Sequence, residues 1–314
     1  MSANATATAR IADRAQSVPD SERGHRIRLY SLYVLAIATN LAIFFYGFDY
    51  YKLSSIDRPF SPKHHMLRPS GPIGLYLGFM GVALFVGIFL YPIRKHWAWL
   101  GQIGKTRRWL DIHVLMGLTA PFIIAFHSTL KFRGIAGMAF WIMFAVSTSG
   151  VVGRYLYAQI PRKVTTAELS MKELQELQEQ LSQQLAAQHV LPEADLRALL
   201  RMPNENFVRK LPTVVALVYM MFLDVVRLFR VARLRRHAVG ILQTVFGFMP
   251  TGNRELERAI HAAAEEAALS KRVLFLSRSQ KVFHLWHVVH KPFSYAFAVL
   301  AMLHIVLQFA LGYF

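Results

Sequence analysis

The last stretch of the chain, residues 281–314, sets the tightest limit on what this sequence can fold into. From Pro292 onward it is apolar, aromatic and rich in small residues, and it contains no Asp, Glu, Lys or Arg. A run of this kind is long enough to cross a bilayer core, which takes ~20 helical residues. Yet it contains His304, and His290 stands just before it. Ionisable side chains are costly inside a membrane helix, so these histidines need a partner or a function.

The interval between these two histidines occurs a second time in apolar sequence. His290 and His304 are fourteen positions apart, and so are His113 and His127. Fourteen residues at ~100° and ~1.5 Å each return to nearly the same helix face after about 21 Å of rise. Two packed membrane helices of this kind bring together two His–His pairs. Such pairs are the axial ligand set of two porphyrin irons.

Composition places the chain between soluble and membrane proteins. It has 314 residues, 54% hydrophobic content and a mean hydropathy of +0.31, which predicts membrane helices together with a soluble part. Cysteine is absent from the sequence, so disulfides, Cys-ligated iron–sulfur clusters and thiolate zinc sites are excluded within this chain. The formal net charge is +18. In a membrane protein, an excess of Lys and Arg is expected in the loops that stay in the cytoplasm. We therefore expect no nucleic-acid partner.

Five apolar runs predict five spans of an all-α, polytopic membrane helix bundle. These runs cover residues 29–50, 71–91, 109–130, 136–156 and the last stretch, 281–314. The first four spans thus occupy residues 29–158, and residues 1–28 are expected to be a cytoplasmic tail. The Lys and Arg cluster after the second span supports a cytoplasmic N-terminus by the positive-inside rule. The predicted location is the inner (cytoplasmic) membrane of a bacterium.

Residues 159–280 predict a helical, partly interfacial insertion in the cytoplasm. Leucines at three- and four-residue steps predict an amphipathic helix over residues 165–188. A second helix is expected over 192–202, and another over 254–269. An insertion of this length between spans indicates a docking surface for a partner, or a hairpin that covers its own apolar stripe.

The run 211–226 allows two interpretations. It is short for a span, it contains Asp224, and strongly basic sequence follows it. If it crossed the membrane, the basic cluster would lie outside, against the charge rule. An interfacial or re-entrant helix is therefore favoured, and a sixth span is the alternative.

Other residues are site candidates because of their position beside the histidines. Gly117 follows His113 by one helical turn on the same face, where a small residue leaves room for a flat macrocycle. Lys291 follows His290, and Arg154 ends the fourth span at the same predicted level. The Lys291–Pro292 step weakens the helical hydrogen bonding beside His290 and can set the angle of its ring. Arg154 can pair with a haem propionate, or it serves only as a topology signal.

His284 and His287 stand apart from the ligand stripe. Seventeen residues separate His287 from His304, which places the two side chains about 100° apart, and His284 is nearly opposite His304. Both lie at the predicted inner boundary of the membrane. They can contact a propionate, relay a proton or border a quinone headgroup, or they can be interfacial anchors.

Two H-x13-H intervals on two parallel spans resemble the di-haem b-type membrane cytochromes. These include the ferric reductase-like transmembrane domain shared with NADPH oxidases and the cytochrome b of quinol-oxidising complexes. The resemblance covers the ligand helices and the span between them. It implies that the axial ligands of two haem b groups are His113, His127, His290 and His304. The sequence has no GxGxxG phosphate loop, so the reductase half of a ferric reductase is not expected in this chain.

The resemblance implies an electron-transfer subunit of an oxidoreductase complex that carries electrons across the lipid bilayer. The implied partners are a soluble flavin or iron–sulfur subunit, a quinone, or an extracytoplasmic cytochrome. The alternative is a haem-free transporter or proton conductor that uses the intramembrane histidines as relays. Such pathways usually contain carboxylates, and we expect the spans to contain no Asp or Glu beyond Asp49, which favours haem.

Overall fold

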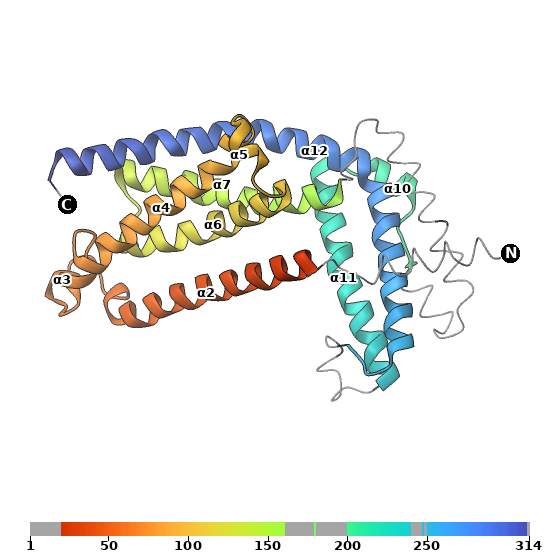
Figure 1. The fold of residues 1–314 in the computed structure, drawn as a ribbon. Coiled ribbons are helices and arrows are strands. Elements are labelled where there is room, and N and C mark those ends of the chain that lie inside the picture. The colour runs from red at the N-terminus through yellow and green to blue at the C-terminus, as the bar shows by residue number, and fades with distance from the viewer. Residues whose placement is uncertain (1–19, 161–178, 180–199, 240–246, 248–249, 313–314) are drawn as a thin grey trace. The chain divides into compact units, whose positions relative to one another are not determined.

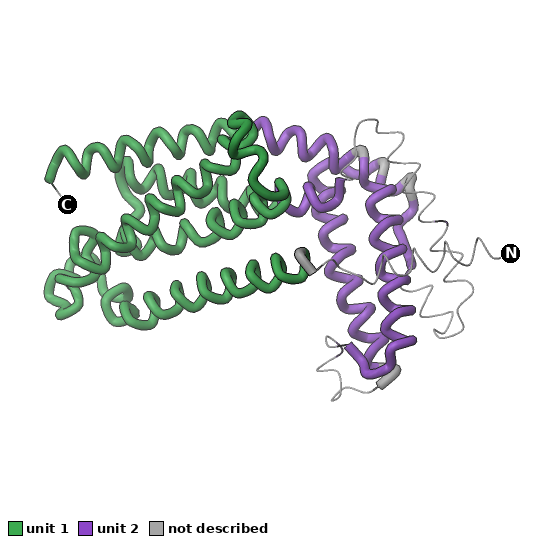
Figure 2. The backbone as a smooth tube through the Cα atoms, viewed as in Figure 1, with its two compact units in different colours: residues 1–152, 289–314 green, residues 153–288 purple. Residues whose placement is uncertain are grey.

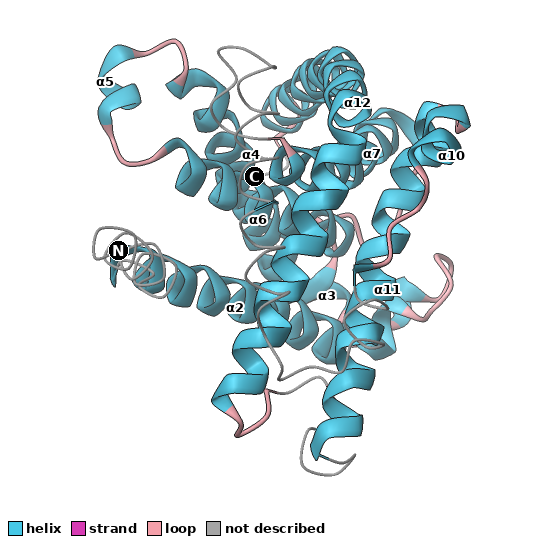
Figure 3. Ribbon diagram, turned by 90° about the vertical axis from the view of Figure 1, so that its right-hand side faces the viewer, coloured by secondary structure: helices cyan, strands magenta, loops and turns pink. Residues whose placement is uncertain are grey.

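Helices make up all the secondary structure in the described part of this computed structural model. Figure 3 shows helices and loops there, and no strand. Five helices are long and apolar enough to cross a membrane, which confirms the predicted all-α polytopic bundle. The structure describes residues 20–160, 179, 200–239, 247 and 250–312. Two predicted helices, over residues 165–188 and 192–202, lie mostly outside the described residues.

The chain divides into two compact units, coloured separately in Figure 2. The first unit contains residues 1–152 and 289–314, and the second contains residues 153–288. The divisions fall inside two long helices, α7 (Gly134–Gln159) and α12 (Arg254–Ala310). The four candidate axial histidines all belong to the first unit.

The first unit is a bundle of long helices joined by short connections (Figure 1). Besides parts of α7 and α12 it contains α2 (Asp20–Tyr51), the 3-10 helix η1 (Arg58–Phe60), α3 (His64–Leu67), α4 (Pro72–Arg94), α5 (Ala98–Gln102) and α6 (Thr106–His127). Proline opens α4 at a position where its missing N–H costs nothing. α6 ends at His127, and the next turn passes through Thr129 and Leu130 with left-handed φ angles of 52° and 59°.

Helices α4 and α6 pack closely because glycines occupy the side of α4 that meets α6. A Cβ at Gly78 would lie 2.9 Å from Cε1 of His127, and one at Gly81 would lie 2.3 Å from Cδ1 of Ile124. Small residues allow this approach in membrane helices, where van der Waals packing drives association. The position of the His127 ring therefore depends on α4.

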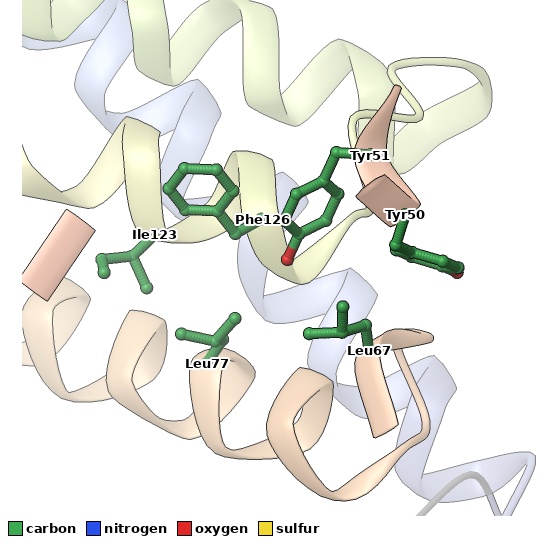
Figure 4. Packing of buried hydrophobic residues seen from close by; sticks show 6 residues of the cluster. All are labelled: Tyr50, Tyr51, Leu67, Leu77, Ile123 and Phe126. Atoms are coloured by element: carbon green, nitrogen blue, oxygen red, sulfur yellow. The ribbon is translucent and has the colours of Figure 1, made fainter. Parts of the chain in front are cut away.

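One end of the first unit is closed by a buried apolar cluster, shown in Figure 4. Its members come from α2, α3, α4 and α6 and are Tyr50, Tyr51, Leu67, Leu77, Ile123 and Phe126. Arg58, only 7% exposed, donates to the carbonyl oxygens of Leu53, Tyr51 and Thr129. A buried charge is tolerated when its donors are satisfied. Arg58 thus joins the segment after α2 to the turn after α6.

The second unit is built on α11 (Thr213–Val239) and the first part of α12, with α10 (Glu205–Lys210) before them. Leu234 of α11 packs in one buried cluster with α12 residues that include Leu256 and Ile260. The Asn253 side chain caps α12 by accepting hydrogen bonds from the backbone N–H groups of Glu255 and Leu256, at 3.1 and 3.2 Å.

Helix α11 contains residues 213–226 of the run 211–226, for which an interfacial helix and a sixth span were both open. It is not among the five helices that the described residues offer as spans. Asp224 accepts hydrogen bonds from Tyr155 Oη, at 2.6 Å, and from Lys271 Nζ, and Arg227 lies 3.0 Å from its other oxygen. The carboxylate is thus part of a polar network inside the second unit.

Candidate functional site

The four candidate ligands come from two helices of the first unit. His113 and His127 lie on α6, and His290 and His304 lie on α12, and all four side chains are half-buried. The described residues contain no cluster of three or more His, Cys, Asp or Glu suited to a metal ion. A bis-histidine haem site needs only two protein ligands, so pairs are the relevant unit here.

Both histidines of α6 are oriented by backbone carbonyls of α4. Nδ1 of His113 lies 3.0 Å from the carbonyl oxygen of Ile88, and Nδ1 of His127 lies 2.8 Å from that of Gly74. A carbonyl oxygen only accepts, so each Nδ1 carries the ring proton and each Nε2 keeps its lone pair. Metal-binding histidines usually have this second hydrogen bond, which fixes the tautomer and the ring orientation.

His290 is oriented in the same way by a hydroxyl group of α7. Its Nδ1 lies 2.8 Å from Oγ of Ser149, which also lies 2.8 Å from the carbonyl oxygen of Val146. The hydroxyl donates its one proton to that carbonyl, so Nδ1 of His290 is the donor in the other hydrogen bond. Nε2 of His290 therefore keeps its lone pair as well.

Electrostatic interactions link His127 to His304 directly, and link His113 through Lys95 to Lys291, which is the neighbour of His290. His127 is close enough to His304 for a charge on one ring to act on the other. Lys95, which follows α4, acts on His113 and also interacts with Lys291, the neighbour of His290. Burial, and then the positive charge of Lys291, hold the pKa of Lys95 below its usual value.

Gly117 and Phe297 lie between the two levels along the helices. A Cβ at Gly117 would meet nothing within 4 Å, so the space beside this turn of α6 is open. The Phe297 ring meets Phe85 edge-on, with centroids 5.6 Å apart, and packs on a cluster that contains Ala120. Gly117 of α6 and Phe297 of α12 thus both belong to the first unit.

Three other predicted site residues belong to the second unit. Nδ1 of His287 lies 3.1 Å from the carbonyl oxygen of Phe283 in its own helix, and its ring contacts Trp286. The guanidinium of Arg154 lies over the Tyr157 ring at 5.9 Å. His284 is exposed. These contacts are local to the second unit and leave the interfacial-anchor interpretation of His284 and His287 as open as before.

Asp111 is a buried carboxylate that the sequence analysis missed. It lies on α6 two residues before His113, is 7% exposed, and its Oδ2 is 3.1 Å from Nε2 of His25 on α2. The expectation that the spans contain no Asp or Glu beyond Asp49 is therefore wrong, because the span predicted over 109–130 itself contains Asp111. The carboxylate is tolerated there because α2 begins at Asp20, so His25 belongs to this helix and supplies a partner.

Three of the four candidate imidazoles have an assigned lone pair on Nε2, which is the atom that a metal would accept as a ligand. No family model, curated protein or solved structure matches the chain. The geometry of the site is therefore the basis for a functional proposal.

Proposed function

We propose that the protein is a membrane di-haem cytochrome b subunit that carries electrons across the bilayer. The observation that supports this most is the set of hydrogen bonds to Nδ1 of His113, His127 and His290. Each bond leaves Nε2 unprotonated and fixes the orientation of the ring. An axial ligand of haem iron requires both.

The residues of the chain have separate tasks in this proposal. His113 and His290 would ligate one haem, and His127 and His304 the other. The carbonyl groups on α4 and the Ser149 hydroxyl hold the rings and raise their basicity. When bound, haem b supplies a one-electron carrier, and the protein ligates, orients and insulates it.

Lys95 and Lys291 support a propionate site beside His113 and His290. Among the described residues no ion pair joins either lysine to a carboxylate, and the charge of Lys291 acts on Lys95. Two ammonium groups repel each other at such a site unless an anion lies near them. A haem propionate has the charge and the hydrogen-bond acceptors that two lysines would bind.

Five candidate spans support an integral membrane protein in contact with the lipid bilayer. A bacterial inner membrane and a cytoplasmic N-terminus are the finer proposals, supported by the basic residues after α4. The redox partners consistent with two haems are a soluble flavin or iron–sulfur subunit, a quinone, and an extracytoplasmic cytochrome. In this proposal the protein is the electron-transfer subunit of an oxidoreductase complex.

The buried Asp111–His25 pair favours a second candidate, a haem-free transporter or proton conductor. A carboxylate and an imidazole 3.1 Å apart inside a membrane bundle are the groups that a proton relay uses. The four membrane histidines would then be further relay groups, with their Nδ1 bonds serving only to fix their orientation.

Haem content separates the two candidates. We expect protein purified from a haem-replete host to give a pyridine haemochrome of the b type with two haems per chain, and a dithionite-reduced minus oxidised spectrum typical of bis-histidine haem. Folded, membrane-extracted protein without haem would contradict the di-haem proposal and leave the proton conductor.

Gly117→Leu is expected to abolish binding of one haem and to leave the chain folded. In the structure a Cβ at Gly117 would meet no atom within 4 Å, so the helices tolerate the start of a side chain there. A macrocycle ligated by His113 would occupy that space. The matched control is Gly252→Leu, because Gly252 also has nothing within 4 Å but lies in the second unit. Haem content and elution volume measure the two effects, and retention of both haems would exclude a macrocycle beside Gly117.

A further inference from the structure

Helix α11 exposes an apolar stripe on one face. The stripe includes Val214, Val218, Met221, Phe222, Val225 and Phe229, whose spacing of mostly three or four residues places them on one side of the helix. Val214 is 71% exposed and Phe222 is 56% exposed. Fifteen residues separate the ends of the stripe, which is about 22 Å of helix.

The rotation of α11 about its axis is fixed by contacts on the opposite side. Ala216 and Met220 are fully buried, and Met220 lines one small cavity with Phe275 and Ser279 of α12. On that side Asp224 accepts from Lys271, and just before α11 the Arg278 side chain donates to the carbonyl oxygen of Leu211. The exposed stripe is therefore a stable feature of the second unit.

The same face becomes basic where the stripe ends. Arg233 and Arg236 follow Phe229 at four and seven residues, and Arg233 is exposed. Elsewhere on α11, Arg227 pairs with Asp224 and Arg235 pairs with Glu257, at 3.0 and 2.7 Å. No acidic residue follows Asp224 in α11. An apolar face that ends in arginines has the charge pattern that complements an anionic surface.

Aromatic rings border the stripe on a second helix. Phe207 of α10 is 50% exposed, and its ring centroid lies 5.8 Å from that of Tyr219, which in turn lies 6.4 Å from that of Phe222. Of these three rings only Tyr219 has a polar end, and tyrosine is typical of the boundary between hydrocarbon and headgroups.

We propose that α11 lies in the surface of a bilayer that contains anionic phospholipids. The stripe would be buried at the acyl boundary, and Arg233 and Arg236 would bind lipid phosphates while their stems cover apolar surface. A lipid surface fits better than a protein partner, because the stripe is apolar from Val214 to Phe229. Charge on this face occurs only beyond the stripe, and it is of one sign. The proposal does not depend on whether the chain binds haem.

Single-cysteine spin labels test the location of α11, since the chain has no cysteine of its own. We place labels at Val218, Phe222 and Val225 of the full chain, one copy per nanodisc, with phosphatidylcholine and phosphatidylglycerol as the lipids. The control label replaces His261, whose side chain is 83% exposed on α12. We expect oxygen, but not a water-soluble nickel chelate, to accelerate the spin relaxation of the α11 labels. The chelate should accelerate the relaxation of the control label. Equal access of the chelate to all labels overturns the proposal, and so does protection from both reagents, which would indicate a protein contact.

The arginines are tested by replacing Arg233 and Arg236 with Gln. In discs with phosphatidylglycerol, each replacement is expected to lower the ratio of lipid-buried to water-exposed α11 label by about fivefold. In pure phosphatidylcholine the same replacements should have little effect. The same ratio in both lipids with the native arginines would overturn the assignment of anionic phospholipid.

Discussion

His127→Ala and His304→Ala are each expected to remove the same haem and to leave the other in place. His113→Ala and His290→Ala are expected to remove the second haem. The reason is that His127 and His304 interact with each other, while His113 and Lys291 both interact with Lys95. Haem per chain should fall by half in every variant, because bis-histidine binding needs both rings. The pyridine haemochrome gives the content, and a redox titration identifies which haem remains.

His261→Ala is the control for these variants, since this histidine is exposed and belongs to the second unit. It should keep both haems at unchanged potentials. Loss of different haems by His127→Ala and His304→Ala would contradict the pairing and would mean that the last span runs in the opposite direction. Retention of full haem content by all four variants would show that other residues bind the cofactor.

Asp224→Leu is expected to destabilise the second unit by about 3–5 kcal/mol, because it leaves the Lys271 ammonium group buried without its partner. Lys271 is 3% exposed, whereas Asp224 is 22% exposed and also contacts Tyr155 and Arg227. Lys271→Met should therefore cost less, and the double variant should recover most of the loss. Hydrogen exchange of α11 and of residues 256–276 measures these differences. Equal losses in the Asp224→Leu and double variants would show that the two residues are not coupled.

The pH dependence of Asp224→Leu gives a second measurement of the same effect. Burial lowers the pKa of Lys271 below its usual value, and Asp224 opposes that shift. Without Asp224 the folded state should bind the lysine proton less tightly than the unfolded state does. The free energy of unfolding should then rise with pH between the folded-state pKa and the ordinary value of 10.5, because the unfolded state binds more protons in that window. The native protein should show a smaller slope there.

Hydropathy predicted the number of spans well but not the ends of the helices. The first span was expected from residue 29, yet α2 begins at Asp20. Its first turns are polar and are held by tertiary contacts, in which Glu22 pairs with Lys105 and His25 pairs with Asp111. Partners far along the chain leave no signal in a hydropathy profile.

The second difference concerns the helix predicted over residues 254–269 and the span predicted from 281. The structure joins them in the single helix α12, Arg254–Ala310. A change from polar to apolar sequence alters the environment of a helix but does not end it. The segment between the two predictions contains neither Gly nor Pro, which are the residues that most often stop a helix.

For the candidate site, spacing predicted which histidines share a helix face but not what holds their rings. The partners of His113 and His127 are backbone carbonyls, at Ile88 and Gly74, and every residue type provides such a group. The sequence therefore contains no specific signal for them. Ser149 is similar, because a serine in a membrane helix usually bonds to its own backbone. Only the packing of α7 against α12 gives it a second role.

The close packing of α6 on the glycines of α4 also has a consequence for the order in which the histidine-bearing helices assemble. Residues are synthesised from the N-terminus, so α4, α6 and α7 are complete long before residue 290 leaves the ribosome. The rings of His113 and His127 need only α4 as their support, and Ser149 is in place before His290 arrives. One half of the ligand set is therefore oriented early in biogenesis, while the other half is added by the final membrane helix. In the proposed di-haem cytochrome, α12 would thus complete both ligand pairs, and a haem would have access from the bilayer until this helix inserts.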